Sequence, residues 1–313
     1  MQFPSITAAT FLAQYWQKKP LFCPGGCSNF SAPISADELA GLALEAEVES
    51  RIVTTNADDY SLIHGPFDEA VFTQPAQTPW TLLVNAVDLW VPELASLYDE
   101  FDFLPRWRMD DIMVSFATTG AGVGPHFDQY DVFLVQASGE RTWKLGQFCD
   151  ASTPVKSGSD LRLLATFTES TRIHMQPGDV LYIPPGLAHW GIADTEGLTF
   201  SVGFRAPTLD ELVDDLAMMV AEDERQTVYS DPPLTPAMAK TDIDDAFVAQ
   251  AQRLMRNLVE DEARFADWFA RFVTNPKYPD LLNITGEERR ARIQGKDYVN
   301  GRPLEDQDTS RES

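Results

Sequence analysis

Apolar and polar residues alternate over short distances through the middle of the chain, from Asp111 to Ala206. Short runs rich in Val, Ile, Phe and Tyr are separated there by Gly, Pro and polar residues. These runs are DIMVSFA, DVFLVQ, RTWKLG, TRIHMQ, DVLYIPP, AHWGI and LTFSVGF. Such a series of short strands with turns between them is typical of an all-β barrel or a double-sheet jelly roll. The lack of helical segments between the runs argues against a parallel β-α-β sheet.

The segments before this region mix helical and strand patterns. Ser35 can cap a helix, with Glu38 completing a capping box. The segment RIVTTNADDYSLIHGPF has two apolar runs around a polar turn, which predicts a pair of strands. The expected elements are a helix over 1–20 closed by Pro20, a loop over 20–33, a helix from Ser35, two strands over 51–67, and a buried strand over 80–85 followed by an amphipathic helix ending near Phe103.

After Ala206 the spacing of apolar residues becomes helical. TLDELVDDLAMMVAEDER predicts one helix, and residues 242–276 predict one long helix or two shorter ones. The Pro-rich SDPPLTP between them is a linker. The polar tail from Gly295 is expected to be disordered at its end. We therefore divide the chain into residues 1–206, 207–275 and 276–313.

Composition describes an ordinary globular protein of 313 residues with 44% hydrophobic residues. We expect no membrane span, because no run approaches the roughly 18 apolar residues that one needs, and we find no signal-peptide pattern at the N-terminus. Cys23 and Cys27 frame CPGGC, but no second pair of zinc ligands has suitable spacing. Free thiols in a reducing cytoplasm are the simpler interpretation.

Charge is strongly negative, with 24 basic against 48 acidic residues and a net charge of −24. Direct nucleic-acid binding is not expected, because neutralising phosphates requires clustered Lys and Arg. An acidic surface attracts basic partners, but it also serves solubility or reflects a salt-adapted host. Charge alone leaves these interpretations open.

His126 and Asp128 stand two residues apart in GVGPHFD, and His189 follows a tight turn in GDVLYIPPGLAHWG. Residues i and i+2 of a strand point to the same side, so the first pair can converge on one point. Two His and one carboxylate form the facial triad that holds iron(II) with open positions. The same ligands also suit zinc, manganese or nickel. We interpret His64 and His174 as structural.

An iron centre that uses 2-oxoglutarate needs a fixed cation for the distal carboxylate of this cosubstrate. Arg141 follows the turn QASGE, and its guanidinium can grip a carboxylate with two hydrogen bonds. The alternative cation is Lys144, three residues on and therefore on the opposite strand face. A surface turn position for Arg141 also fits the sequence.

PHFDQYDVF, GERTWKLG and GDVLYIPPGLAHWG resemble the JmjC-type 2-oxoglutarate oxygenases of the cupin superfamily. More narrowly, they resemble the bacterial ribosomal oxygenases, which hydroxylate an arginine of a large-subunit ribosomal protein. FLAQYWQKKPL, WTLLVNAVDLWVPE and FLPRWRMDDIMVSFA extend the resemblance, which covers roughly residues 5–275.

The resemblance implies an α+β fold with a double-stranded β-helix, or jelly-roll, core over about 80–206 within a JmjC catalytic domain. It implies that His126, Asp128 and His189 are the iron ligands and catalytic centre, and that Arg141 binds 2-oxoglutarate. Ser115 is a weaker candidate for contact with the cosubstrate. One atom of oxygen would convert 2-oxoglutarate to succinate and carbon dioxide, and the other would become a hydroxyl on the substrate.

The same resemblance makes a basic large-subunit ribosomal protein the expected partner in the cytoplasm. Asp111 and Tyr130 are the candidates for holding a substrate arginine, although Asp111 can simply end a turn and Tyr130 can simply pack in the barrel. Alternatives are a ribosomal histidine, a methyl-lysine, or a non-catalytic cupin that binds a basic partner. Residues 207–275 would form a helical region that makes a homodimer, and 276–313 a short or incomplete winged-helix-like part.

Overall fold

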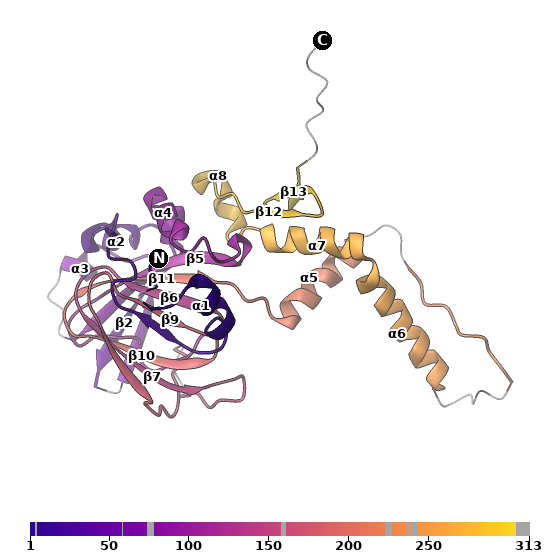
Figure 1. Cartoon of the computed structure of the whole chain (residues 1–313), viewed down its shortest axis with the longest axis horizontal. Coiled ribbons are helices and arrows are strands. Elements are labelled where there is room, and N and C mark those ends of the chain that lie inside the picture. The colour runs from indigo at the N-terminus through magenta and orange to yellow at the C-terminus, as the bar shows by residue number, and fades with distance from the viewer. Residues whose placement is uncertain are drawn as a thin grey trace, which may run out of the picture. The chain divides into compact units, whose positions relative to one another are not determined.

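The computed structural model describes residues 1–3, 5–57, 59–73, 78–157, 161–222, 227–236, 238 and 243–304. The chain divides into two compact units, Met1–Ala206 and Pro207–Ser313 (Figure 1). Each unit has its own sheet and helices. Within the described residues, no helix combines the length and the apolar character that crossing a membrane requires.

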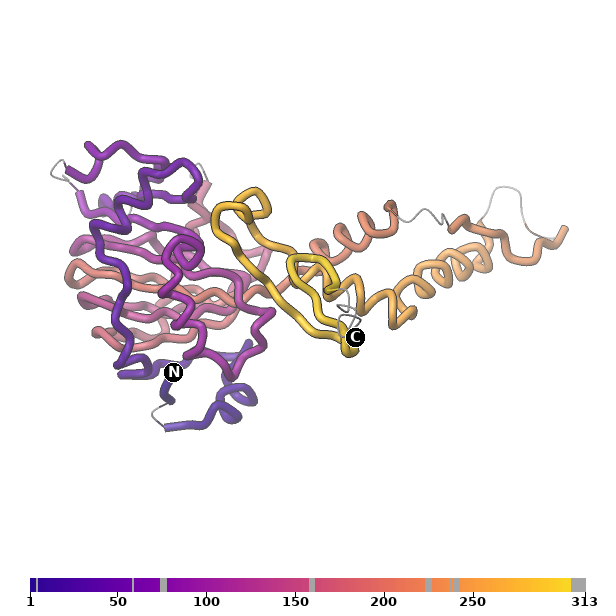
Figure 2. Tube along the Cα trace, turned by 90° about the horizontal axis from the view of Figure 1, so that it is seen from above, coloured from indigo at the N-terminus to yellow at the C-terminus, as the bar shows by residue number. Residues whose placement is uncertain are grey.

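The first unit contains two antiparallel sheets, whose strands run alongside one another in Figure 2. The larger sheet has the order β1-β9-β6-β11-β5-β4-β2-β3 and the smaller one the order β10-β7-β8. The larger sheet is built from β1 (Leu21–Cys23), β2 (Ser50–Asn56), β3 (Asp59–His64), β4 (Trp80–Val84), β5 (Met109–Ala117), β6 (Asp131–Gln136), β9 (Val180–Ile183) and β11 (Gly197–Phe204). The smaller sheet is built from β7 (Arg141–Phe148), β8 (Thr171–Met175) and β10 (Leu187–Ala193). All seven runs predicted between Asp111 and Ala206 are strands, which confirms the predicted double-sheet core.

The larger sheet buries a different kind of residue on each of its two faces. Because side chains alternate along a strand, Ile112 of β5 joins an apolar core on one face while Ser115 points to the other. The first face packs against N-terminal segments through aromatic rings. Phe133 of β6 lies 4.7 Å from Phe101 and 5.7 Å from Phe11, measured between ring centroids. These contacts hold the helices on the outside of the sheet.

The second face meets the smaller sheet across a separate apolar core. This core contains Val132, Leu134, Trp143, Leu145, Met175, Leu181, Ile183 and Leu187. Several polar side chains on the facing strands are also almost completely buried, among them Ser115, Gln136, Arg141 and Thr199. Buried polar groups are expensive unless they are paired, so the space between the two sheets is where a functional site is expected.

Several N-terminal predictions were wrong in extent. The helix expected over 1–20 is only α1 (Ala8–Gln14), because Thr7 caps its start and Gln17 adopts a left-handed φ of 56° soon after its end. The expected loop over 20–33 contains β1, which pairs with β9. The capping box of Ser35 and Glu38 is confirmed, on α2 (Ala36–Leu42).

The strand predicted over 80–85 is β4, but the helix expected after it is broken into short pieces. They are η1 (Val87–Leu89), η2 (Pro92–Leu94), α4 (Ala95–Asp99) and η3 (Arg106–Arg108), and α3 (Ala70–Thr73) precedes β4. Pro92 has no backbone N–H and so interrupts helical hydrogen bonding. The side chain of Asp88 also accepts hydrogen bonds from the backbone N–H of Ile112, at 2.8 Å, and from the hydroxyl of Tyr98, at 2.9 Å.

Asp88 makes the stability of the first unit depend on pH. Burial raises the pKa of Asp88 to about 6, from 3.8. A raised carboxyl pKa means that the folded state binds the proton more tightly than the unfolded state. Protonation of Asp88 therefore stabilises the folded state; this stabilisation is fully present below pH 3.8 and is lost as the pH rises through about 6. When the pH falls from 7 to 5, we expect the unfolding free energy of the native protein to increase by about 1 kcal/mol relative to that of Asp88→Asn. Urea unfolding of both proteins at both pH values measures this difference, and equal pH dependence would contradict it.

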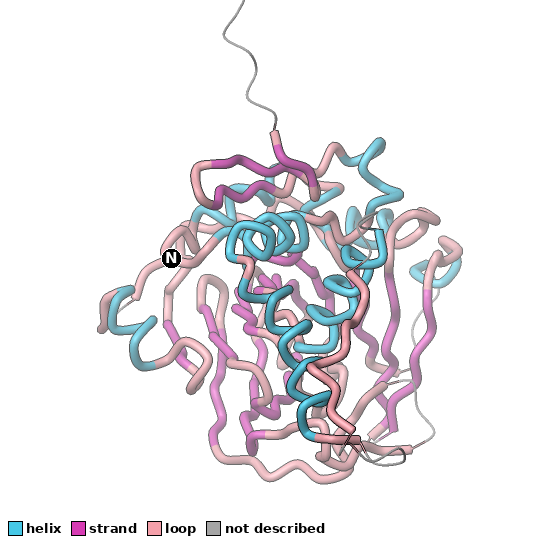
Figure 3. The backbone as a smooth tube through the Cα atoms, turned by 90° about the vertical axis from the view of Figure 1, so that its right-hand side faces the viewer, coloured by secondary structure: helices cyan, strands magenta, loops and turns pink. Residues whose placement is uncertain are grey.

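The second unit is formed by helices and a small sheet, which are distinguished by colour in Figure 3. Its elements are α5 (Leu209–Glu222), α6 (Asp245–Glu260), α7 (Glu262–Thr274), η4 (Pro279–Leu281), α8 (Leu282–Thr285), β12 (Arg290–Ile293), β13 (Lys296–Val299) and β14 (Arg302–Pro303). After the Pro-rich linker the chain forms two helices, α6 and α7, where the sequence predicted one long helix or two shorter ones. The polar tail was expected to be disordered at its end, and residues 305–313, on which that expectation falls, lie outside the described part. The residues before them include β13 and β14. Gln294-Gly295 and Asn300-Gly301 have positive φ at both positions, which closes two tight hairpins.

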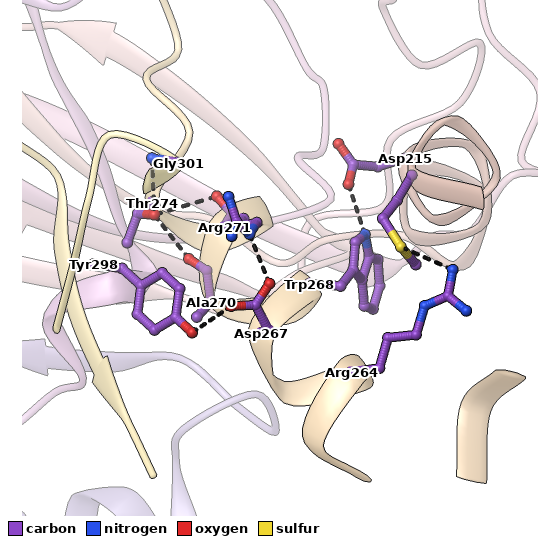
Figure 4. Close-up of polar contacts among 10 residues, drawn as sticks. Asp215, Arg264, Asp267, Trp268, Ala270, Arg271, Thr274, Tyr298 and Gly301 are labelled. Carbon is purple, nitrogen blue, oxygen red and sulfur yellow. Dashed lines mark hydrogen bonds and ion pairs between the residues drawn. The ribbon is translucent and has the colours of Figure 1, made fainter. Parts of the chain in front are cut away.

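Helix α7 organises the second unit (Figure 4). The carboxylate of Asp267 accepts hydrogen bonds from Tyr298 of β13 and from Arg271, both at 2.7 Å. At the next residue of the helix, the indole N–H of Trp268 donates to Asp215 of α5 at 2.7 Å. The hydroxyl of Thr274 accepts from the backbone of the second hairpin at 3.1 Å. These contacts join α5 and the small sheet to one helix.

Candidate metal centre and active site

His126 and His189 are brought together by a local β-bridge rather than by a long strand. The backbone N–H of each donates to the carbonyl of the other, at 3.1 and 2.8 Å. We expected the His126–Asp128 pair at the mouth of a strand, but the segment before β6 is mostly irregular and β6 starts only at Asp131. The contact with the His189 segment is antiparallel. It joins a loop of one sheet to β10 of the other.

The three predicted ligands converge. One ligand atom from each of His126, Asp128 and His189 lies within 4.8 Å of the other two. Nδ1 of each imidazole lies 2.9 Å from a backbone carbonyl, that of Gly124 or that of Leu187. A carbonyl at Nδ1 fixes the tautomer and leaves Nε2 with its lone pair for a metal. Nε2 of His189 lies 3.5 Å from Oδ2 of Asp128.

Electrostatics also suit a metal at this point. His189 is 2% exposed. Burial lowers its pKa to about 4, and the nearby His126 adds to the effect. The imidazole is therefore neutral at physiological pH, which is the state that coordinates metals. Two imidazoles and a carboxylate are a donor set that fits a divalent first-row ion.

A glycine turn supports the carboxylate ligand from behind. The backbone N–H of Gly186, in the Pro-Pro-Gly turn, donates to the carbonyl of Asp128 at 2.7 Å. Gly186 has a φ of +77°, and a Cβ there would lie 2.7 Å from the carbonyl oxygen of Cys149. Only glycine suits this position. The turn that leads to His189 thus also positions the loop that carries Asp128.

Arg141 lies inside the barrel. It is 5% exposed, it is directly opposite Ala193 in the β7–β10 ladder, and its Nε has no hydrogen-bond partner among the described residues. Burial lowers the pKa of Arg141 to about 10. A buried guanidinium with an unused N–H is a site for an anion, and a carboxylate fits it in charge and shape. The residues present therefore fit 2-oxoglutarate at this end of the barrel.

Ser115 and Lys144 differ in their position relative to Arg141. Ser115 of β5 is buried on the inner face, where its hydroxyl donates to the carbonyl of Thr199 at 3.4 Å. Lys144 projects from the outer face of β7, and its Nζ lies 4.1 Å from the ring centroid of Trp190. This arrangement removes Lys144 as the alternative anchor and leaves Ser115 within the barrel interior.

A cleft of about 490 Å³ opens beside the metal ligands. It is lined by His126, Asp128, Tyr130, Arg51 and His64, among others. The negative charge of Asp128 raises the pKa of Tyr130, with burial and Asp111 as further causes. Tyr130 thus stays protonated among carboxylates at the cleft. Asp111 acts on it from β5, where its Oδ1 faces Gly203.

Comparisons with known proteins agree with this geometry. A JmjC domain family matches residues 96–212. Over 269 residues, 86% of this chain and 71% of the relative, the sequence is 39% identical to the ribosomal protein uL16 3-hydroxylase of Escherichia coli. The chain belongs to the JmjC-domain ribosomal oxygenases. A probable ribosomal oxygenase of Haemophilus influenzae is 37% identical over 289 residues, 89% of this chain and 71% of the relative.

A solved structure extends the similarity to other ribosomal oxygenases beyond the barrel. YcfD, a ribosomal oxygenase from Escherichia coli in complex with cobalt and 2-oxoglutarate, has a TM-score of 0.84 at 35% identity. The alignment covers 96% of this chain and 86% of that chain.

Sequence reasoning missed some residues of this ribosomal oxygenase site. Arg51 was not considered and His64 was interpreted as structural, but they pair with each other across the β2–β3 hairpin and both line the cleft. No local pattern reveals this, because it depends on how the hairpin extends the larger sheet. Trp143 had a usable signal, since it stands two residues after Arg141 on the same strand face.

His174, which we interpreted as structural, lies on the outer side of the smaller sheet. It is about half exposed, with Nε2 3.4 Å from Glu140 and Nδ1 3.2 Å from Asp194. Cys23 and Cys27 are buried free thiols, and burial raises the pKa of Cys23 to about 12 and that of Cys27 to about 11. These residues are outside the metal centre.

Proposed function

We propose that this chain is an iron(II)- and 2-oxoglutarate-dependent hydroxylase of ribosomal protein uL16 and that it acts on an arginine side chain. One observation carries the proposal. Three metal-binding side chains converge within 4.8 Å, and a buried arginine with an unpartnered Nε lies in the same barrel. A metal-binding structural protein has no need for the second feature.

Each part of the chain has a distinct task in this reaction. His126, Asp128 and His189 would hold the metal, and Arg141 would bind the distal carboxylate of 2-oxoglutarate, with Ser115 beside it. Iron(II), when bound with 2-oxoglutarate and oxygen, supplies the oxidation that inserts one oxygen atom into a C–H bond of the substrate and yields succinate and carbon dioxide. The apolar core between the sheets excludes water from this end of the barrel.

The cleft beside the metal supports a cationic substrate. Tyr130 offers an aromatic ring and a hydroxyl, and Asp111 and Asp128 supply negative charge near it. A guanidinium is held well by carboxylates and aromatic rings. The net charge of −24 also attracts a basic ribosomal protein to the surface and raises its encounter rate. A histidine or a methyl-lysine of a ribosomal protein remains the alternative target.

Incubation of the purified chain with uL16, iron(II) and 2-oxoglutarate tests the proposal. We expect uL16 to gain one oxygen atom, measured by intact mass, and one molecule of 2-oxoglutarate to be converted to succinate per hydroxylation. Fragmentation then locates the hydroxyl on an arginine. Oxygen uptake by another ribosomal protein but not uL16 would favour the alternative substrates. Binding to a basic partner without succinate formation would favour a non-catalytic cupin.

Helices α5 and α6 support a further part of this proposal, a homodimer. Neither helix has a buried residue, although both are amphipathic. The side chains exposed on them include Val213, Met218, Val248, Met255 and Val259. Exposed apolar faces of this kind are typical of subunit interfaces, and a second copy of the same chain covers them symmetrically. The mass of the protein in solution, measured by light scattering, tests this.

The cytoplasm, where ribosomal proteins are made, is the proposed location.

A further inference from the structure

Trp143 has a buried polar group that none of the described residues satisfies. The side chain is 5% exposed, and its Nε1 has no hydrogen-bond partner among the described residues. The ring belongs to the apolar core between the sheets, whose other members are aliphatic side chains, Met175 and Phe22, and none of these offers a strong acceptor. A buried N–H without an acceptor costs about 1–3 kcal/mol. Such a group is available to donate to an acceptor that comes from outside the chain, and its position decides which acceptor it can reach.

The position of Trp143 indicates where that acceptor would lie. Directly opposed residues of a ladder share one face, and here Leu145 opposes His189, Trp143 opposes Gly191 and Arg141 opposes Ala193. Trp143 thus stands between the metal ligand and the buried arginine. Its ring centroid lies 5.8 Å from that of His189 and 5.7 Å from the guanidinium carbon of Arg141.

Gly191 makes room for the indole at this place. A Cβ at Gly191 would lie 2.8 Å from two carbons of the Trp143 ring. Any other residue at this position would displace the ring from between His189 and Arg141. Gly191, in the HWG segment that contains the metal ligand, is therefore needed for the packing of the Trp143 ring.

Two unsatisfied donors, Nε of Arg141 and Nε1 of Trp143, thus occupy successive inward positions of β7. A single carboxylate has enough lone pairs to accept from both. We propose that the indole N–H of Trp143 donates a hydrogen bond to the distal carboxylate of 2-oxoglutarate, beside the guanidinium of Arg141. This inference rests on the proposed function, and it adds to it a neutral donor that fixes the orientation of the carboxylate.

Trp190 provides a matched control within the same ladder. Its Nε1 is also buried and unpartnered, but Trp190 opposes Lys144 and so lies on the outer face of the same strands. Its ring packs at right angles to Phe167, with 6.1 Å between centroids. Trp190→Phe removes the same atoms as Trp143→Phe without touching the space between Arg141 and His189.

The experiment is calorimetric titration of the zinc-loaded proteins with 2-oxoglutarate and with succinate, which keeps the distal carboxylate. A hydrogen bond to a charged group is worth about 1.5–3 kcal/mol, so we expect Trp143→Phe to weaken both ligands about tenfold or more. Trp190→Phe is expected to bind both as the native protein does. Unchanged affinities in Trp143→Phe, or equal losses in the two variants, would overturn the inference.

A second measurement needs no folded Trp143 variant. In the native zinc-loaded protein with ¹⁵N-labelled tryptophan, the indole N–H resonance of Trp143, assigned by elimination with the other Trp→Phe variants, should move downfield when 2-oxoglutarate is added. A resonance that does not move would overturn the inference even though the ligand binds. If the native protein does not bind 2-oxoglutarate at all, the proposed function is wrong. If it binds 2-oxoglutarate but the Trp143 resonance does not move, only this inference is wrong, so the two failures are distinguishable.

Discussion

Asp128→Ala is expected to abolish hydroxylation and to reduce metal binding severely. The carboxylate is the only acidic ligand of the three, and its removal leaves two imidazoles, which hold a divalent cation weakly. Losing a residue that merely orients a ligand already costs about 10–100-fold in metal affinity or activity, so losing a ligand should cost more than about 100-fold. Metal content by mass spectrometry and oxygen transfer to uL16 measure the two effects separately. His126→Ala is expected to behave in the same way.

The control for this prediction is His174→Ala. His174 also lies near carboxylates, Glu140 and Asp194, but on the outer side of the smaller sheet. Its replacement should leave metal content and activity unchanged. Full activity in Asp128→Ala would contradict the assignment of the metal centre. Equal losses in Asp128→Ala and His174→Ala would indicate general damage to the sheet instead.

Arg141→Met is expected to raise the KM for 2-oxoglutarate by about 100-fold, since a two-pronged contact between a guanidinium and a carboxylate is worth about 3 kcal/mol. The turnover number at saturating 2-oxoglutarate should change much less, because the metal ligands are untouched. The same substitution should also stabilise the ligand-free protein, on the order of 1–3 kcal/mol, because it removes a buried charge without an acceptor at Nε. Steady-state kinetics and urea unfolding measure these opposite effects.

Arg172→Met is the matched control. Arg172 lies on the adjacent strand β8, is exposed and makes an ion pair with Glu169 at 2.9 Å. It should change neither the KM nor the unfolding free energy by much, because exposed ion pairs contribute little. An unchanged KM for 2-oxoglutarate in Arg141→Met, or a lower unfolding free energy than that of the native protein, would contradict the role of Arg141 as a buried cation that binds the anion.

The barrel strands could be predicted from the sequence because their signal is local. Each run from DIMVSFA to LTFSVGF has β-branched or aromatic residues bounded by turn residues. In contrast, β1 has only three residues, and it is a strand because β9 lies beside it. The N-terminal helix was predicted too long because Tyr15 and Trp16 continue the helical spacing. These rings instead pack against the aromatic core, where Trp16 lies 5.7 Å from Tyr182.

The candidate site was predictable to a different degree. The three metal ligands stand in short motifs rich in Gly and Pro, so their spacing identified them without a fold. Arg141 was ambiguous until the strand face was known, because Lys144 offered a second cation. Arg51 and His64 could not be found, since their place at the cleft depends on the pairing of β2 with β4 and β3, far from the metal ligands in sequence.

The order of the larger sheet has a consequence for how this protein is made. Its strand β11 lies between β5 and β6, although it is the last strand of the first unit to leave the ribosome. Until Phe204 has emerged, β5 and β6 each expose an unpaired edge, and neither can complete its ladder. Pairings between segments distant in sequence form slowly. An enzyme proposed to modify ribosomes thus cannot complete the sheet around its own active site until Phe204, the last residue of β11, has left the ribosome.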